Sequence, residues 1–121
     1  MLLSEVRSIL NAEVLCCEDR LDTVVLAACG SDFMSDVLAY VKNQALLLTG
    51  LVNPQVVRTA DMMDMKCIVF VRGKRPDSGM LELARERGIV IMASPFPMYV
   101  ACGELYVHGL RSSWQQPAAE N

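Results

Sequence analysis

Short runs of apolar residues alternate along this chain with segments in which apolar residues recur every three or four positions. A run that is apolar at every position is typical of a strand covered on both faces, as in a parallel sheet between two layers of helices. The clearest runs, at residues 45–49 and 66–71, flank a segment with helical spacing. A strand, a helix and a strand of this length predict a right-handed βαβ crossover.

The remaining segments extend this pattern in both directions. Three more strands are predicted at residues 13–17, 23–29 and 89–93. Spacing and capping residues predict five helices: one that ends near Asn11, one capped by Ser31, one capped by Asn53, one between Ser78 and Gly88, and one from Met98 that Gly103 interrupts. The sum is an α/β fold, a three-layer α/β/α sandwich with a largely parallel, five-stranded sheet. The sheet would be mixed if the first two strands form a hairpin-like pair.

The length of 121 residues suits one domain with a single core. We expect this domain to span residues 1–111, and we expect the polar residues 112–121, which include Trp114, to be a disordered tail. No apolar run is long enough to cross a bilayer, and the first ten residues contain Glu5 and Arg7, unlike a secretory signal. We therefore expect a cytoplasmic protein that has no membrane partner.

Charge and cysteine content disfavour two further classes of function. The net charge is −3 and both signs are interspersed, whereas nucleic-acid binding needs a concentrated basic face. The five cysteines form no CxxC pair, and the single histidine, His108, is far from them in sequence. Buried thiols are therefore favoured over a zinc site. We expect no nucleic-acid partner, no metal and no cofactor.

Small, polar or charged residues follow each strand of the predicted parallel sheet. In an open parallel sheet, ligands bind beyond the carboxyl ends of the strands, where helices that begin there offer free amide donors to a phosphate or carboxylate. The candidate ligand-binding residues are Ser31, Asp32, Thr49, Gly50, Asn53, Arg72, Gly73, Lys74 and Ser94. Turn geometry and helix capping alone explain the same residue types, and we weigh that explanation more heavily than a ligand pocket.

Motifs for catalysis are absent from the sequence. Residues 72–79 lack the spacing of a P-loop, and no GxGxxG occurs. Ser94 is not in a GxSxG context, and His108 has no carboxylate partner at a fixed spacing. Asp32 is explained by the dipole of the helix that follows it, and Asp36 by solvent, rather than by a shared cation. We expect no catalytic residues and no enzyme activity.

Three stretches of the sequence together resemble the DRTGG domain. They are SDFMSDVLAYV from residue 31, LLLTGLVNPQVVRTADMMDMKCIVFVRGKRPD from residue 46 and LELARERGIVIMASPFPMYVACGEL from residue 81, and the resemblance covers about residues 4–110. Thr49 and Gly50 match the Thr-Gly of the family signature, whereas Leu51 replaces its next glycine. The family is similar in fold to the N-terminal domains of HPr kinase/phosphorylase and of the Mur ligases, which agrees with the three-layer sandwich.

The resemblance implies a regulatory, dimer-forming module. DRTGG domains occur in the middle of phosphotransacetylases and beside the CBS pairs of regulated inorganic pyrophosphatases, where they look like modules of this kind. Our first hypothesis is a non-catalytic regulatory or interaction module that self-associates as a homodimer and contacts a partner enzyme. The alternative is a small-ligand sensor that binds a nucleotide or another phosphorylated metabolite at the carboxyl ends of the strands. An enzyme of phosphoryl or acyl transfer is the third and weakest hypothesis.

Overall fold

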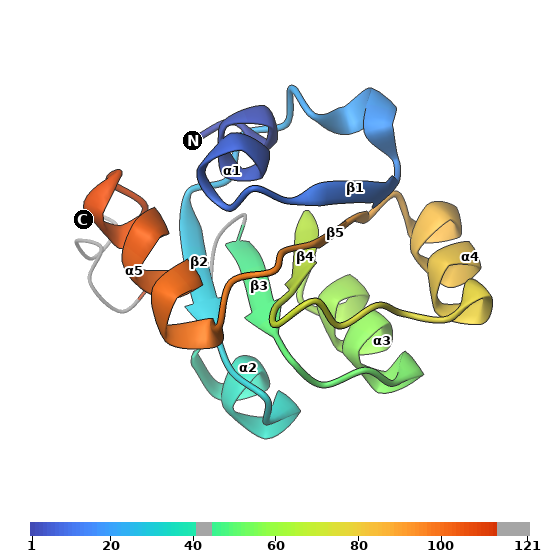
Figure 1. Ribbon diagram of the computed structural model, residues 1–121. Helices are drawn as coiled ribbons and strands as arrows, with labels where there is room; N and C mark the ends of the chain where they lie inside the picture. The colour runs from blue at the N-terminus through green and yellow to red at the C-terminus, as the bar shows by residue number, and fades with distance from the viewer. Residues whose placement is uncertain (41–44, 114–121) are drawn as a thin grey trace.

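A five-stranded sheet forms the centre of the computed structural model, which describes residues 1–40 and 45–113. Its strands are arranged in the order β1-β5-β4-β3-β2. The strands are β1 (Glu13–Cys16), β2 (Ala27–Gly30), β3 (Ala45–Thr49), β4 (Cys67–Phe70) and β5 (Val90–Ala93). Strands β2 to β5 are parallel neighbours in chain order, and β1 runs antiparallel to β5 at one edge (Figure 1).

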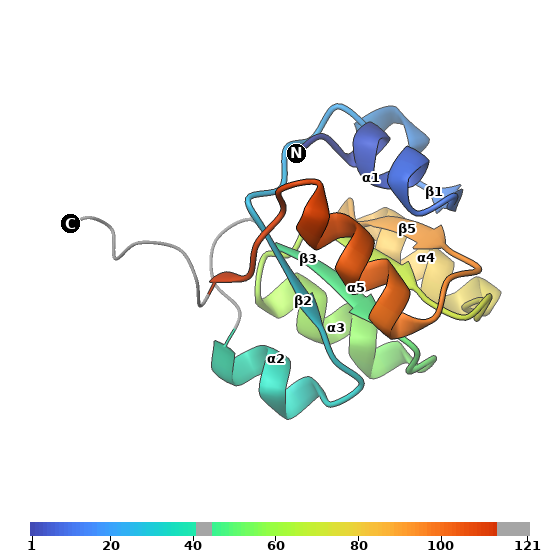
Figure 2. The same cartoon turned by 60° about the vertical axis from the view of Figure 1, so that its left-hand side comes forward.

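Helices cover both faces of this sheet. Because β2 to β5 follow one another in chain order, successive right-handed crossovers place their helices on the same face. This face carries α2 (Met34–Tyr40), α3 (Pro54–Met62) and α4 (Ser78–Arg87). The other face is covered by α1 (Leu3–Ile9) and α5 (Met98–Val107), the first and the last helix in the sequence, which lie side by side (Figure 2). The predicted three-layer α/β/α sandwich is confirmed.

Side chains of the central strands alternate between two cores. Leu47, Ile68 and Phe70 pack against α2, α3 and α4. Leu46, Leu48 and Val69 pack against α1 and α5. Every residue of β3, β4 and β5 is buried, which explains why the apolar runs in the sequence do not alternate.

The two N-terminal strands do not pair with each other, so the predicted hairpin-like pair is wrong. They lie at opposite edges of the sheet, and the sheet is mixed because β1 pairs with β5. Arg75 binds Glu13 with two hydrogen bonds of 3.0 and 3.3 Å, which ties β1 to the loop after β4 and lowers the pKa of the Glu13 carboxyl. The short helix η1 (Glu18–Arg20) follows β1.

Strand β2 is also shorter than predicted, because the chain before it pairs with the N-terminus. The Val25 N–H donates to the Met1 carbonyl at 2.8 Å, and Leu2 forms an isolated bridge with Val24. On the outer edge of β2, the Ala28 N–H donates to the Arg111 carbonyl at 3.0 Å. The segment after α5 therefore lies along this edge of the sheet.

Two helices differ from their predictions. Helix α2 begins at Met34, because the Ser31 hydroxyl accepts a 3.0 Å hydrogen bond from the Phe33 N–H and forms a short turn before the helix. Phe33 is consequently exposed rather than part of the core. Helix α5 continues through Gly103, so the predicted interruption is wrong.

Other local predictions are confirmed. The Asn53 side chain accepts from the Gln55 N–H at 2.8 Å and caps α3, whose first residue is Pro54. Gly88, with φ of 70°, ends α4. The predicted tail falls largely on residues 114–121, which include Trp114 and lie outside the described residues. None of the described helices is long and apolar enough to span a bilayer.

Candidate functional site at the carboxyl ends of the strands

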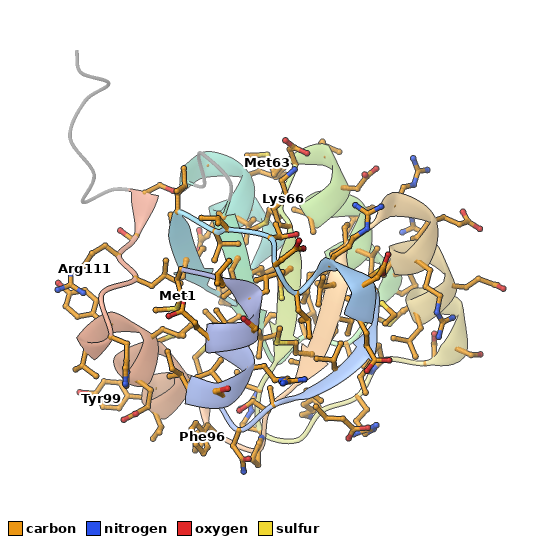
Figure 3. The ribbon with its side chains drawn as sticks, turned by 90° about the horizontal axis from the view of Figure 1, so that it is seen from above. Met1, Met63, Lys66, Phe96, Tyr99 and Arg111 are labelled. Atoms are coloured by element: carbon orange, nitrogen blue, oxygen red, sulfur yellow. The ribbon has the colours of Figure 1, made fainter. Side chains whose placement is uncertain are left out.

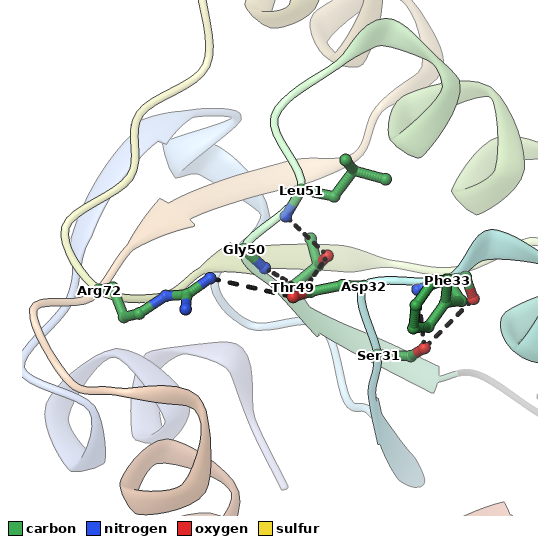
Figure 4. A network of polar contacts seen from close by, with 7 residues as sticks. All are labelled: Ser31, Asp32, Phe33, Thr49, Gly50, Leu51 and Arg72. Carbon is green, nitrogen blue, oxygen red and sulfur yellow. Dashed lines mark hydrogen bonds and ion pairs between the residues drawn. The ribbon is translucent and has the colours of Figure 1, made fainter.

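The carboxyl ends of β2, β3 and β4 meet at one edge of the sheet. Main-chain pairing continues beyond the strands: the Ser31 N–H donates to the Leu48 carbonyl at 3.0 Å, and the Val71 N–H donates to the Thr49 carbonyl at 3.0 Å. The loops that leave the three strands are thereby held side by side. This brings together Asp32, Thr49, Gly50 and Arg72 (Figure 4).

Asp32 is the centre of this polar network. Its Oδ1 accepts a 2.7 Å hydrogen bond from the Gly50 N–H and a 3.2 Å hydrogen bond from the Thr49 hydroxyl. Its Oδ2 lies 3.9 Å from Nη2 of Arg72, and each of these two side chains is about half exposed. The carboxylate thus bonds to the end of β3, which the helix-dipole explanation from the sequence did not include. It occupies the donors that an anionic ligand would use at this edge.

Arg72 and Gly73 form a tight turn immediately after β4. Both residues have positive φ, 57° and 69°, and the Lys74 N–H closes the turn on the Val71 carbonyl at 3.1 Å. Glycine adopts this conformation without steric cost, whereas arginine does not. The Arg72 N–H also donates to the Phe96 carbonyl at 2.8 Å, which holds the turn against the loop after β5.

The other candidate residues have separate structural roles. Ser94 is fully buried, and its hydroxyl donates to the Leu10 carbonyl at 2.7 Å and accepts from the Phe96 N–H at 3.2 Å. Asn53 caps α3, and Ser31 bonds to the main chain of Phe33. Lys74 is exposed, and its N–H belongs to the turn. The Asp32 network therefore contains four of the nine candidates.

The topology explains why the strand ends are joined rather than separated. Open α/β sheets form their ligand crevice where the order of the parallel strands reverses. Here β2, β3, β4 and β5 are adjacent in chain order, so these four strands contain no reversal. Loops after β2, β3 and β4 all lead to helices on one face, and their polar groups bond to one another.

A second candidate, which the sequence analysis missed, lies at the opposite edge of the sheet. A cavity of about 310 Å³ at the amino ends of β4 and β5 is lined by five charged residues: Arg20, Asp61, Asp64, Lys66 and Arg87. Two ion pairs lie in its wall, Lys66 with Asp64 at 3.3 Å and Arg87 with Asp61 at 3.6 Å. These residues come from separate segments, so no local motif in the sequence signals them.

The histidine and the cysteines lie apart from the Asp32 network. His108 is exposed at the end of α5, and its Nδ1 lies 2.7 Å from the Glu104 carbonyl of the same helix. All five cysteines are free, and Cys16 and Cys67 are buried. Within residues 1–40 and 45–113, no three His, Cys, Asp or Glu side chains are grouped as a metal ion would require.

Comparison with known proteins shows the family to which this chain belongs. The model of the DRTGG domain matches residues 5–103. This chain belongs to the DRTGG domain family. A search of curated proteins found no relative with significant sequence similarity.

A solved structure shares the fold of this DRTGG domain. It is the crystal structure of the CBS and DRTGG domains of the regulatory region of Clostridium perfringens pyrophosphatase, complexed with the activator diadenosine tetraphosphate. The TM-score is 0.68 at 15% sequence identity, and the match covers 98% of this chain and 51% of that one. Our chain therefore spans about half the length of this neighbour, and at this identity the likeness shows the fold.

Proposed function

We propose that this DRTGG domain is a non-catalytic regulatory module that self-associates as a homodimer and acts on a partner enzyme. The observation that carries the proposal is the apolar outer surface of α5, where Tyr99 is 89% exposed and Val107 is 74% exposed. Its membership of a family found in the regulatory region of a pyrophosphatase supports the regulatory role.

Helix α5 is apolar on the side that faces away from the sheet as well as on the side that packs. Ala101 and Leu105 are buried against the sheet, whereas Tyr99, Val100, Tyr106 and Val107 are exposed. A helix that is apolar all round is typically buried on all sides, and contiguous apolar surface marks an interaction site. A second protein surface over α5 would supply the missing burial.

The polar residues of the candidate site support a non-catalytic role. The Asp32 carboxylate accepts from the Thr49 hydroxyl and from the Gly50 N–H, and it pairs with Arg72. The Ser94 hydroxyl is buried and bonded to main-chain groups. In this arrangement the polar side chains that catalysis would require hold the loops together instead.

Sedimentation equilibrium over a wide range of protein concentration tests the homodimer. We expect the apparent mass to rise from the 13.4 kDa of one chain towards twice that value as concentration increases. A mass that stays at one chain throughout would contradict self-association. Turnover of a phosphorylated or acylated substrate that survives purification and is lost in Arg72→Ala would contradict the non-catalytic role.

The Asp32 network favours a second candidate function, a sensor for a nucleotide or another phosphorylated metabolite. A main-chain amide, a hydroxyl and a guanidinium converge on the Asp32 carboxylate, and these are groups that bind phosphate. Binding would require a ligand phosphate to displace that carboxylate. The nucleotide bound in the Clostridium perfringens structure supports this ligand class.

A thermal-shift titration tests the sensor. ATP, diadenosine tetraphosphate and inorganic phosphate would be added to wild type, Asp32→Asn and Arg72→Ala. A ligand selective for the folded state raises the melting temperature with the logarithm of its concentration. We expect the largest rise in Asp32→Asn, where a competing negative charge is removed, and the smallest in Arg72→Ala. A rise that Arg72→Ala leaves intact but Arg20→Ala abolishes would place the ligand in the cavity at the other edge.

A further inference from the structure

We infer that the cavity at the amino ends of β4 and β5 binds a small polar metabolite through a single carboxylate or phosphate group. The inference is independent of the proposed homodimer and concerns a site away from the Asp32 network. Figure 3 shows Lys66, which lines this cavity, on the opposite side of the protein from Phe96, which follows β5 at the carboxyl edge of the sheet. A ligand in this cavity would not have to displace the Asp32 carboxylate.

Separate segments of the chain supply the polar groups of this cavity. Arg20 is the last residue of η1, and the Thr23 N–H donates to the Arg20 carbonyl at 3.1 Å, which fixes the turn between them. Asp61 lies in the last turn of α3, Lys66 lies immediately before β4, and Arg87 lies in the last turn of α4. The site therefore exists only when these ends of helices and strands are packed together.

The cavity contains hydrogen-bond donors that have no partner within residues 1–40 and 45–113. Lys66 donates to Asp64 at 3.3 Å. By contrast, the Arg87 side chain approaches Asp61 at 3.6 Å without a hydrogen bond. Within the same residues, the Arg20 side chain has neither a hydrogen bond nor an ion pair, and the Thr23 hydroxyl has no partner. Two guanidinium groups and a hydroxyl can thus donate to an oxyanion, and a guanidinium binds carboxylate or phosphate through two parallel hydrogen bonds.

The Arg20 guanidinium lies flat against the main chain of Gly88. A Cβ built on Gly88 would lie 3.0 Å from Cζ of Arg20 and 3.1 and 3.3 Å from its two terminal nitrogens. Because these three distances are nearly equal, one face of the guanidinium covers Gly88, and its N–H edge is left for a ligand. Gly88 has a φ of 70°, a conformation that favours glycine, so this close approach is part of the way α4 ends.

The wall of the cavity indicates a small and polar ligand. Its two apolar side chains, Met65 and Ile89, are each only 2% exposed, so a ligand would meet mainly charged groups, the Thr23 hydroxyl and main chain. The volume of about 310 Å³ lies at the lower end of the range for small-molecule sites, about 300–1,000 Å³. Hydroxyl groups on the ligand would find acceptors in the Asp61 and Asp64 carboxylates.

The balance of charge in the cavity favours a ligand with one anionic group. Three cationic side chains and two carboxylates line the wall, which leaves a net charge of +1. Helices α3 and α4 both end at this edge, and each carboxyl end contributes about half a negative charge. A polyphosphate such as ATP would place several negative charges beside Asp61, Asp64 and both helix ends. We therefore expect a carboxylate or a phosphate monoester to bind better than ATP.

The helix ends also offer a purely structural explanation for Arg20. A cation near the carboxyl end of a helix stabilises that helix, and Gly88 directly follows the last residue of α4. If this were the only role of Arg20, its removal would lower the melting temperature and leave the affinity for an oxyanion unchanged. The two explanations therefore differ in what Arg20→Ala does to ligand binding.

Amide NMR spectra of the full chain, recorded during titration, test the site. The probes are glycerol phosphate, lactate and ATP, with sodium chloride at matched ionic strength as the reference. We expect saturable shifts of the Thr23, Lys66 and Gly88 amide signals with glycerol phosphate or lactate, and the tighter of the two identifies phosphate or carboxylate as the preferred group. ATP should bind more weakly than that probe.

Two arginine variants separate a specific site from general attraction between charges. Arg20→Ala should weaken binding about ten-fold or more, because charge-assisted hydrogen bonds to the ligand are lost. Arg85→Ala is the matched control, since it removes the same charge from the last turn of α4 at a position that does not line the cavity. We expect Arg85→Ala to leave the affinity within about two-fold of wild type.

Several results would overturn the inference. They are shifts no larger than those in sodium chloride, an affinity that Arg20→Ala leaves unchanged, and equal losses in Arg20→Ala and Arg85→Ala. Saturable shifts at Thr49 and Gly50 instead would assign the oxyanion to the Asp32 network. Tighter binding of ATP in this cavity would overturn the ligand class. The homodimer is tested separately by its mass, so its failure and the failure of this site are distinguishable.

Discussion

Nη2 of Arg72 lies against the main chain of Gly50, at the point where a side chain on Gly50 would begin. The two residues, one after β3 and one after β4, therefore lie together in this arrangement because position 50 has no Cβ, and a side chain there would displace the Arg72 guanidinium. The same guanidinium lies 3.9 Å from the Asp32 carboxylate, which in turn bonds to the Gly50 N–H. The ends of three parallel strands are thus connected through two side chains and one amide.

The left-handed backbone of Arg72 gives a first prediction. For a residue with a side chain, this conformation destabilises the folded state by about 1 kcal/mol, and a half-exposed ion pair stabilises it by less than about 1 kcal/mol. Arg72→Gly loses the pair and the strain, whereas Arg72→Ala loses only the pair. We expect the glycine variant to be the more stable of the two by about 1 kcal/mol in urea unfolding. Equal stability of the glycine and alanine variants would mean that the left-handed backbone at position 72 carries no strain.

The buried hydroxyl of Ser94 gives a second prediction. Ser94→Ala leaves the Leu10 carbonyl and the Phe96 N–H without this partner, which costs about 1–3 kcal/mol of unfolding free energy. Ser35→Ala on the exposed side of α2 is the control and should change stability by less than about 0.5 kcal/mol. Urea unfolding of both variants measures the difference. Similar values for the two would show that the Ser94 bonds contribute little.

The cap of α3 gives a third prediction. Asn53→Ala removes the acceptor of the Gln55 N–H and should lower the unfolding free energy by about 1 kcal/mol, whereas Asn53→Asp keeps an acceptor and should be nearly neutral. Thermal unfolding distinguishes the two variants. If Asn53→Ala instead left stability unchanged and removed a ligand-induced thermal shift, Asn53 would be a ligand residue rather than a cap.

The buried thiols give a fourth prediction. Burial raises the pKa of the Cys16 thiol to about 11 and that of the fully buried Cys67 thiol further still. Both thiols are therefore protonated at neutral pH, and native protein should react with iodoacetamide at these positions far more slowly than unfolded protein does.

The raised pKa of the buried thiols also determines whether stability rises or falls at alkaline pH. An unfolded cysteine loses its proton from about pH 8.5, before the folded one does, so stability should fall as pH rises from there towards 11. Unfolding in urea at several pH values measures this slope. Cys16→Ala should flatten it, and an unchanged slope in that variant would show that Cys16 does not contribute.

Local signals in the sequence were sufficient for the central part of the fold. The unit of β3, α3 and β4 followed from two fully apolar runs, the Asn53 cap and Pro54, because each signal acts within a few residues. The partner of β1 did not follow, because pairing at a sheet edge depends on segments far apart in sequence. The continuation of α5 through Gly103 did not follow either, since packing of Ala101 and Leu105 outweighs the local cost of glycine.

The candidate site was predictable to a similar degree. Strand-end positions identified Asp32, Thr49, Gly50 and Arg72, because parallel strands in register end together. The sequence did not reveal that Asp32 bonds to the Gly50 amide, since that contact depends on the path of the loop after β2. Nor could it reveal the charged cavity at the amino ends of β4 and β5, whose residues meet only in the folded chain.

The contact between Ala28 and Arg111 limits how copies of this protein can associate. An exposed edge strand invites strand addition, which propagates into aggregates without a defined end. Here the chain after α5 occupies an outward-facing donor of β2, so that its own backbone caps the edge as a foreign strand would. A chain cut short before Leu110 would lose this contact and leave the outer edge of β2 open to strand addition.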